Sequence, residues 1–508
     1  MKYSWPYQNT PYLSALPGVG GPGLDVSNGD KPSKIYLITS RENVKEGGSV
    51  PELGPNVFAG TLWWVQYADQ GEEFSKWVLP LESGYAYHGD GLNAPDGRGD
   101  LDYVGHAAPG AGLIIQCTSM NMRGSNTRIW HMASWVGDQP TMEGQSFEAD
   151  QRDCLQASSS TVDVNRIAHI NCDARFSMDE SVQVWYEAQG CSWIRGAIYD
   201  PLHTPPDFAM PDDPNHAEGV DHGYGHLISG KADYSLTMQS LYAHTTDRNP
   251  LVATPNHAHI NNLHYNHGRP HVAAGVALNI SDNGDHNEAQ GRTMQCNCVG
   301  NVSVRGPEQN DSIVLAKVLT VTPGSTGHSA NNSCFGWPSP ASQEGFFTSQ
   351  PEDYLRSTVR RSAWPQGLGA NYDGTLKPCA DPLSPRVQEG LAFSQLMRET
   401  VGCMPARRYL YQGGVNKVLD QIDAAIRGVP FDGGQYVNTV EEAGGWPALP
   451  TLSLDPKNPT ADWHAPFPFG ADRDDVYDSG FLVDGSSRAG LNKIREWVIN
   501  QYHFVMGR

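Results

Sequence analysis

The sequence predicts an all-β protein, a right-handed parallel β-helix with an irregular N-terminal arm and with C-terminal loops and short helices. From Ile114 onward, short alternating apolar and polar runs recur, in the later part roughly every 18 to 25 residues. That is about the length of one turn of a β-solenoid, which needs several coils to bury a continuous core. The 54 glycines and 36 prolines add the turns that such a chain requires.

The strand-like runs carry the fold prediction. A sandwich or barrel would show shorter, more even spacing and hairpin dipeptides, so the solenoid is the preferred interpretation. The runs cover residues 113–122, 127–136, 166–176, 182–188, 192–200, 234–244, 257–266, 275–281, 294–304 and 312–321.

Three regions follow from this pattern. Residues 1–40 are rich in proline and glycine and have little periodicity, so we expect an N-terminal arm. Residues 41–330 are expected to form the parallel β-helix, with a long polar loop at 199–231 of the kind that often carries binding groups. Residues 331–508 are expected to wrap its sides and cap its ends, with helical periodicity at 414–426 and 491–505.

Charge and composition exclude several partners. A formal net charge of −21 argues against nucleic acid, which requires a basic surface. No run approaches the ~18 apolar residues of a membrane-spanning helix, so membrane insertion is not expected. The N-terminal residues lack the apolar segment of a signal peptide. We therefore expect an extracellular protein whose leader was removed, or a protein carried on a virion.

The nine cysteines are scattered and odd in number, which is not a disulfide framework. Cys172 and Cys191 lie in strand-like runs and are expected to be small buried residues. Cys296-x-Cys298 could supply two ligands of a metal site, but no matching pair lies nearby in the sequence. Half of the 18 histidines lie between His216 and His271. They fit a transition-metal site or, equally well, histidines stacked inside a β-helix or lining a sugar cleft.

Residues 236–268 contain the sequence features that are most informative about function. They hold three short strand-like runs separated by tight turns, with the charged segment Asp247-Arg248-Asn249-Pro250 between two of them. Along residues 261–266, polar side chains recur as if stacked in ladders. Strands, polar ladders and an arginine at a strand end together suggest a surface for polysaccharide.

Several segments, in order along the chain, resemble the pectate lyase superfamily, specifically the single-chain parallel β-helix lyases of polysaccharide lyase family one. The similarity spans about residues 60–450. Its segments are residues 105–112 (GHAAPGAG), 124–126 (GSN), 128–131 (RIWH), 137–138 (GD), 177–180 (SMDE), 222–225 (HGYG), 243–250 (AHTTDRNP), 261–266 (NNLHYN), 300–307 (GNVSVRGP), 402–407 (GCMPAR) and 444–447 (GGWP).

The resemblance implies an enzyme that cleaves a uronate polymer, such as pectate or a host surface polysaccharide, by β-elimination. It implies that acidic residues, here Asp179 and Glu180, hold Ca²⁺, and that Arg248 is the catalytic base. A cation on the uronate carboxylate stabilises the negative charge that develops when the neighbouring proton leaves. Guanidinium is normally always protonated, so an arginine base needs surroundings that lower its pKa.

Three further residues are expected to bind the acidic polysaccharide: His222, Tyr224 and Arg269. The chain also departs from the family pattern. Ile170 and Asn171 stand where the family has a metal-binding Asp-His pair, so one expected carboxylate is missing. No second arginine follows Pro250, and Asp247 beside Arg248 favours the protonated guanidinium.

Two alternatives remain open at this stage. Arg248 fits a structural role as partner of Asp247, and the chain then fits a non-catalytic carbohydrate-binding or structural virion protein that kept the fold and lost the cation site. The second alternative concerns where the protein acts. An enzyme for a polymer that does not cross membranes fits a phage tail spike or other appendage, attached to other virion proteins through residues 1–40.

Overall fold

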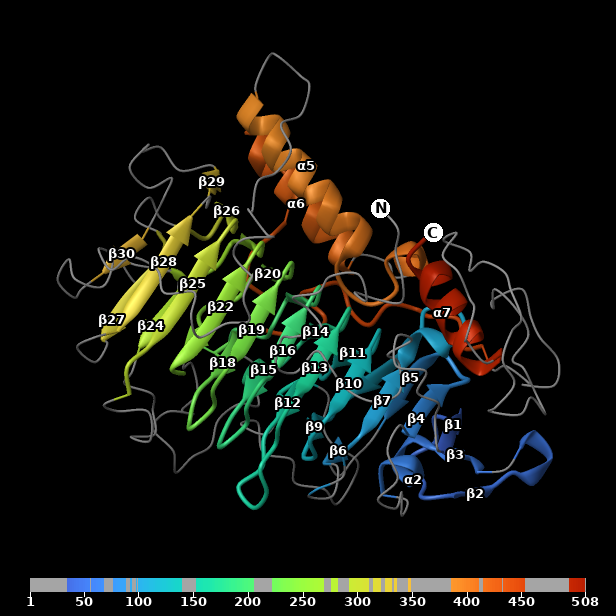
Figure 1. Cartoon of the computed structure of the whole chain (residues 1–508). Helices are drawn as coiled ribbons and strands as arrows, with labels where there is room; N and C mark the ends of the chain where they lie inside the picture. Colours follow the sequence, from blue (N-terminus) through green and yellow to red (C-terminus); the bar gives the residue numbers. More distant parts are fainter. Residues whose placement is uncertain are drawn as a thin grey trace.

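The computed structural model describes residues 34–54, 56–67, 76–87, 92–93, 97, 99–138, 152–204, 222–268, 276–281, 292–309, 314–320, 325–330, 333–335, 346–348, 385–410, 414–431, 433–452 and 493–507. Their strands stack coil on coil into one elongated solenoid (Figure 1). Successive coils pair in parallel along three sheets, and among the described strands only β2 pairs antiparallel, with β3. The predicted parallel β-helix is therefore confirmed.

The first sheet, in order of pairing, contains β2 (Gly47–Ser49), β3 (Val57–Thr61), β1 (Lys34–Ser40), β4 (Lys76–Pro80), β7 (Leu101–Val104), β10 (Thr127–Trp130), β13 (Ile167–Ile170), β16 (Ser192–Ile194), β19 (Ser235–Met238), β22 (Asn256–Ile260), β25 (Gln295–Val299) and β28 (Thr326–Ala330). The second contains β29 (Ser333–Phe335), β26 (Val302–Val304), β23 (Leu263–Tyr265), β20 (Leu241–Ala243), β17 (Ala197–Tyr199), β14 (Asp173–Arg175), β11 (Ala133–Trp135), β8 (Leu113–Gln116) and β5 (Gly84–Tyr87). The third contains β30 (Phe346–Thr348), β27 (Val314–Thr320), β24 (Val276–Ser281), β21 (Leu251–Val252), β18 (Tyr224–Ile228), β15 (Glu180–Val184), β12 (Leu155–Ala157), β9 (Met120–Met122) and β6 (Leu92–Asn93).

Most of the strand-like runs in the sequence are two short strands, one in each of two sheets. The chain bends between the first and second sheets at a residue with positive φ, a conformation that non-glycine residues adopt rarely. These bends stack from coil to coil: the amide of Asn171 donates to the carbonyl of Ile194, and that of Arg195 to the carbonyl of Met238. The bend residues are His131, Asn171, Arg195, Gln239, Asn261 and Gly300.

The interior of the solenoid is a continuous apolar core. Cys172 and Cys191 lie in it, and burial raises the pKa of both thiols to about 12. The prediction that they are small buried residues is confirmed. The coil that runs from β19 to β22 carries no long loop and is short: Leu236 pairs with Ala258, 22 residues further along the chain.

Strand pairing crosses both of the region boundaries drawn from the sequence. β1 lies inside the expected arm of residues 1–40, yet it pairs in parallel with β3 and β4. At the other end, β29 and β30 pair in the sheets beyond residue 330. Any arm therefore ends before Lys34, while the division into three regions stays a prediction.

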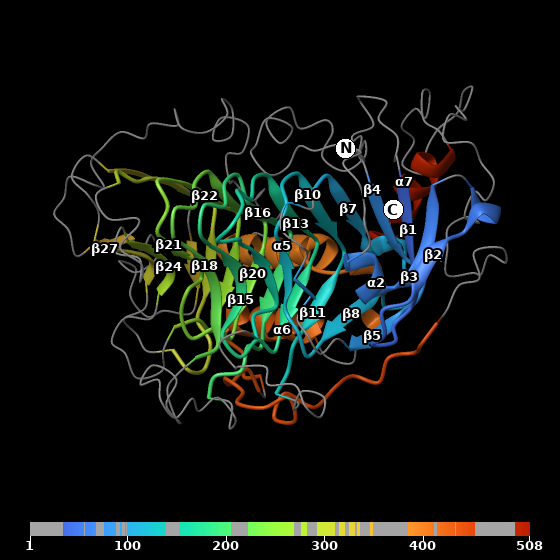
Figure 2. The same ribbon diagram turned by 90° about the horizontal axis from the view of Figure 1, so that it is seen from below.

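Helices cover two outer faces of the solenoid. The α-helices are α2 (Leu62–Tyr67), α5 (Pro385–Thr400), α6 (Gly414–Arg427) and α7 (Lys493–Val505), and the 3₁₀ helices are η2 (Pro51–Leu53), η3 (Gly105–Ala107) and η9 (Pro405–Leu410). Helices α5 and α6 pack on the second sheet, where Phe393 and Val418 share a core cluster with Tyr199 and Leu241 (Figure 2). Helix α7 packs on the first sheet through Tyr502. None of the helices among the described residues is long and apolar enough to span a membrane.

Helices α6 and α7 match the helical periodicity of the sequence, and α5 was not predicted. The buried positions of α5 alternate apolar residues with small polar ones, as at Phe393 and Ser394, so the segment lacks a clear apolar stripe.

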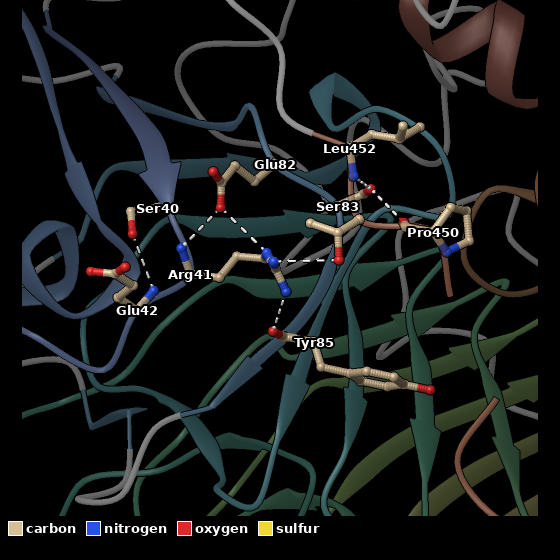
Figure 3. Close-up of polar contacts among 9 residues, drawn as sticks. Ser40, Arg41, Glu42, Glu82, Ser83, Tyr85, Pro450 and Leu452 are labelled. Carbon is tan, nitrogen blue, oxygen red and sulfur yellow. Dashed lines mark hydrogen bonds and ion pairs between the residues drawn. The ribbon is translucent and has the colours of Figure 1, made fainter. Parts of the chain in front are cut away.

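A C-terminal strap, residues 433–452, runs along the flank of the second sheet. Arg41 fixes its end, because its guanidinium donates to the carbonyl of Tyr85 at 2.8 Å and to Oγ1 of Thr451 at 3.4 Å, and pairs with Glu82 (Figure 3). The amide of Ser83 donates to the carbonyl of Leu452. These contacts join the N-terminal coils of the solenoid to the C-terminal strap.

Candidate functional site

Three carboxylates gather at the start of two adjacent strands of the third sheet. Asp153 lies just before β12, and Asp179 and Glu180 lie at the start of β15. One oxygen of each lies within 4.8 Å of the others. Glu180 and Asp153 are almost fully buried. Like charges this close repel one another unless a cation or a proton intervenes. An all-oxygen donor set of this kind suits Ca²⁺.

Asp153 was not identified from the sequence, and it supplies the third carboxylate. Its Oδ1 accepts a hydrogen bond from the amide of Glu180 at 2.8 Å, and its Oδ2 accepts one from Gln156 at 2.7 Å. These bonds fix the carboxylate in place. No signal in the sequence pointed to it, because residues 155–157 are not among the strand-like runs; counting back from Leu155, which pairs with Val182, Asp153 lies one coil before Glu180.

The residues at the expected ligand position have structural roles. Ile170 is fully buried in the core cluster outside the first sheet. The side-chain amide of Asn171 donates to the carbonyls of Thr400 and Gly402, which ties the end of α5 to the solenoid. Residue 170 has no carboxylate, but the acidic group still has three members, because Asp153 supplies the third.

Arg248 lies against the same carboxylates. Its guanidinium forms an ion pair with Glu180 and lies 4.3 Å from the ring centre of Tyr224. The side chain is 20% exposed. Oδ1 of Asp247 accepts a hydrogen bond from the backbone amide of Arg248 at 2.7 Å. Arg248 itself has a φ of 57°. The turn thus directs the guanidinium past β18 toward the carboxylates at the start of β15, two coils away.

His222 and Tyr224 complete this cluster. Nε2 of His222 lies 3.7 Å from Oδ1 of Asp179. The centres of the His222 and Tyr224 rings are 4.8 Å apart. Tyr224 pairs with Glu180 across the sheet. The structure thus brings together five of the six residues singled out in the sequence. Arg269 lies outside the described residues.

The buried histidines form a ladder inside the solenoid. Nδ1 of His257 bonds to Ser235 at 2.8 Å, Nδ1 of His259 bonds to Thr237, and Nε2 of His259 bonds to Nε2 of His264 at 2.9 Å. His257 and His259 pair in register with Cys296 and Cys298. Within the part of the chain that the structure describes, only the three carboxylates bring ligand atoms close enough for a metal. The ladder therefore supports the structural interpretation of the histidines.

Among solved structures, this one is similar to pectate lyases, the proteins that the sequence motifs resemble. One, from Bacillus sp. N165 in complex with trigalacturonate, has a TM-score of 0.42 at 9% identity, covering 77% of this chain and 97% of that one. Another, bound to a hexasaccharide, has a TM-score of 0.40 at 10% identity, covering 79% and 98%. A third, from Xanthomonas campestris, has a TM-score of 0.35 at 9% identity, covering 77% and 100%.

The sequence matches no protein-family model and no curated protein. At these TM-scores the structural similarities add nothing to the fold, which rests on the strand pairing described above.

Proposed function

We propose that this protein is a polysaccharide lyase that cleaves a uronate-containing glycan by β-elimination. The observation that carries the proposal is the contact of Arg248 with a group of three carboxylates. A base beside a cation site is the arrangement that removal of a proton next to a carboxylate requires.

Asp153, Asp179 and Glu180 would hold Ca²⁺, which fits their oxygen donors and their charge. When bound, it would supply positive charge to the uronate carboxylate. Arg248, released from Glu180 and having given up its own proton to water, would take the proton from C5 of the uronate. The C4–O bond would then break as a C4–C5 double bond forms, and the leaving oxygen would take a proton from water.

Tyr224 and His222 would position the sugar. Both are mostly buried and lie beside the reacting groups, Tyr224 against Arg248 and His222 against Asp179. Arg269 remains a proposed substrate contact on the strength of the sequence alone.

One observation favours a second function, non-catalytic binding of an acidic glycan. The ion pair with Glu180 stabilises the protonated guanidinium of Arg248, and a protonated guanidinium binds carboxylates but takes no proton. A binding or structural protein would need only that form.

Release of unsaturated uronate separates the two functions, and its absorbance follows it directly. With polygalacturonate or another acidic glycan and Ca²⁺, the native chain is expected to release the product, and Arg248→Lys is expected to lose most of that activity. A folded native chain that binds these glycans and releases no product from any of them would support the binding function.

We further propose that the chain acts on a virion, as a tail spike or similar appendage attached through its N-terminal residues. A truncation that tests this must end before Lys34, because β1 is part of the first sheet. Removal of residues 1–33 is expected to abolish incorporation into particles and to leave the solenoid folded. Normal incorporation of the truncated chain would contradict the attachment role.

A further inference from the structure

A second cavity, of about 250 Å³, lies under the C-terminal strap, apart from the carboxylate group. Four segments distant in sequence enclose it: the turn after β17, the turn after β20, helix α6 and residues 433–443. Ligand pockets for drug-sized molecules are typically about 300–1,000 Å³. This cavity therefore has room for one small molecule.

One stripe of α6 forms a wall of the cavity. Lys417, Val418 and Gln421 line it, together with Gly414 at the start of the helix. Positions three, four and seven residues apart lie on the same face of a helix, which explains why these side chains meet the cavity together. Gln421 is only 2% exposed. A buried amide facing a cavity needs hydrogen-bond partners there.

The opposite wall is a buried network of charges. Asp200 accepts a hydrogen bond from Nδ1 of His244 at 2.6 Å and pairs with Arg175 at 2.7 Å. Burial alone would raise the pKa of Asp200, but Arg175 and His244 hold the pKa below its usual range. Because the carboxylate accepts from Nδ1, that nitrogen carries the proton. Nε2, the other ring nitrogen, remains for a partner from the cavity.

Two polar atoms of the lining residues are left over. Oε1 of Gln421 and Nε2 of His244 are buried and have no hydrogen-bond partner among the described residues. Leaving a buried polar atom unsatisfied costs about 1–3 kcal/mol, so a hydrogen-bonding group is expected to occupy the cavity. A hydroxyl group can both donate and accept, without charge.

We propose that this cavity binds one uncharged, hydroxyl-rich sugar ring. Its hydroxyls would hydrogen-bond to Oε1 of Gln421 and Nε2 of His244, while the side chains of Val418, Val437 and Tyr436 provide an apolar wall for the ring. The cavity lies near the turn that carries Arg248, since His244, which lines the cavity, comes four residues before Arg248. It would hold a neutral unit of a glycan and does not depend on lyase activity.

Saturation-transfer NMR on the full chain tests the proposal, with galactose, glucose and mannose as neutral probes and galacturonate as the charged one. We expect transfer to at least one neutral sugar and at least tenfold weaker binding by Gln421→Leu, which keeps the volume of the side chain and removes the amide. Gln501→Leu, at a buried glutamine of α7, is the matched control and should bind as the native chain does.

Two further variants locate the binding. Ala443→Phe should block the cavity from the strap and abolish binding, and Asp179→Asn should leave binding of neutral sugars unchanged. Absence of transfer to every neutral sugar, a preference for galacturonate, or equal binding by Gln421→Leu would each overturn the proposal and leave a cavity that holds only water. Loss of lyase product with neutral-sugar binding intact would count against the proposed function alone.

Discussion

Arg248 is ion-paired with Glu180, although the two residues are two coils apart: Glu180 begins β15, Arg248 lies just before β21, and β18 pairs between these two strands. The guanidinium therefore supplies positive charge to three clustered carboxylates. Any metal ion that binds there competes with Arg248 for the oxygens of Glu180. Metal binding and release of Arg248 are thus coupled in this site.

The coupling predicts that Arg248→Ala binds Ca²⁺ more tightly than the native chain. Removal of the guanidinium leaves the carboxylates with no competing cation from this side chain, so their mutual repulsion favours the ion. Calorimetric titration with CaCl₂ is expected to show a several-fold lower dissociation constant. An unchanged or higher constant in a folded variant would show that Arg248 and the ion do not share Glu180.

Asp153→Asn is expected to weaken Ca²⁺ binding at least tenfold, because it removes one of the three charged ligands while its amide oxygen can still accept the hydrogen bond from the Glu180 amide. Glu187→Gln is the matched control. Glu187 is an exposed carboxylate paired with Lys231 at 2.7 Å, outside the group of three. Equal affinity in both variants would remove Asp153 from the metal site.

Acid is expected to destabilise the solenoid between about pH 6.5 and pH 3. Burial lowers the pKa of His169 to about 3, whereas the unfolded chain takes up the proton near 6.5. Within this window the unfolded chain binds more protons, so the free energy of unfolding falls as the pH falls. His257 and His267, also with a pKa of about 3, act in the same direction.

His169→Phe removes one such proton. Between pH 7 and pH 5 its free energy of unfolding should therefore fall by roughly 2 kcal/mol less than that of the native chain. Urea unfolding at the two pH values measures the difference. Identical losses in both chains would mean that His169 is not held neutral in the folded state.

Gly105→Ala is expected to destabilise the chain by ~1–3 kcal/mol, because the added methyl group has no room. A Cβ at this position would lie 2.3 Å from the carbonyl oxygen of Trp130 and 2.4 Å from that of His131. Gly48→Ala is the control, since nothing lies within 4 Å of its Cβ. Thermal unfolding of the two variants should separate them clearly, and matching midpoints would contradict the close approach at Gly105.

The sequence predicted the coils because apolar residues alternate within each run, as in residues 234–244 and 257–266. It did not predict that these two runs bend, the first at Gln239 and the second at Asn261. A polar residue with positive φ looks the same in the sequence as an outward-facing strand residue. Helix α5 was missed for a related reason, since its buried face contains Ser394 beside Phe393.

The site was predicted where its residues are neighbours in the sequence or in a motif. Asp179, Glu180 and Arg248 were found in this way, and the structure places them together. Asp153 was missed because its approach to Glu180 depends on the stacking of β12 on β15, a contact between coils that no local pattern records. The missing carboxylate at residue 170 was recognised from the sequence, and the structure places Ile170 in the apolar cluster outside the first sheet.

The Ca²⁺ dependence of product release tests the central claim most directly. Unsaturated uronate released from polygalacturonate is measured while Ca²⁺ is raised from zero, after treatment with a chelator, in the native chain and in Asp153→Asn. The account predicts no product without Ca²⁺, saturation in the native chain, and a midpoint at least tenfold higher for Asp153→Asn. Product release that is equal with and without Ca²⁺, or equal in the two chains, would contradict it.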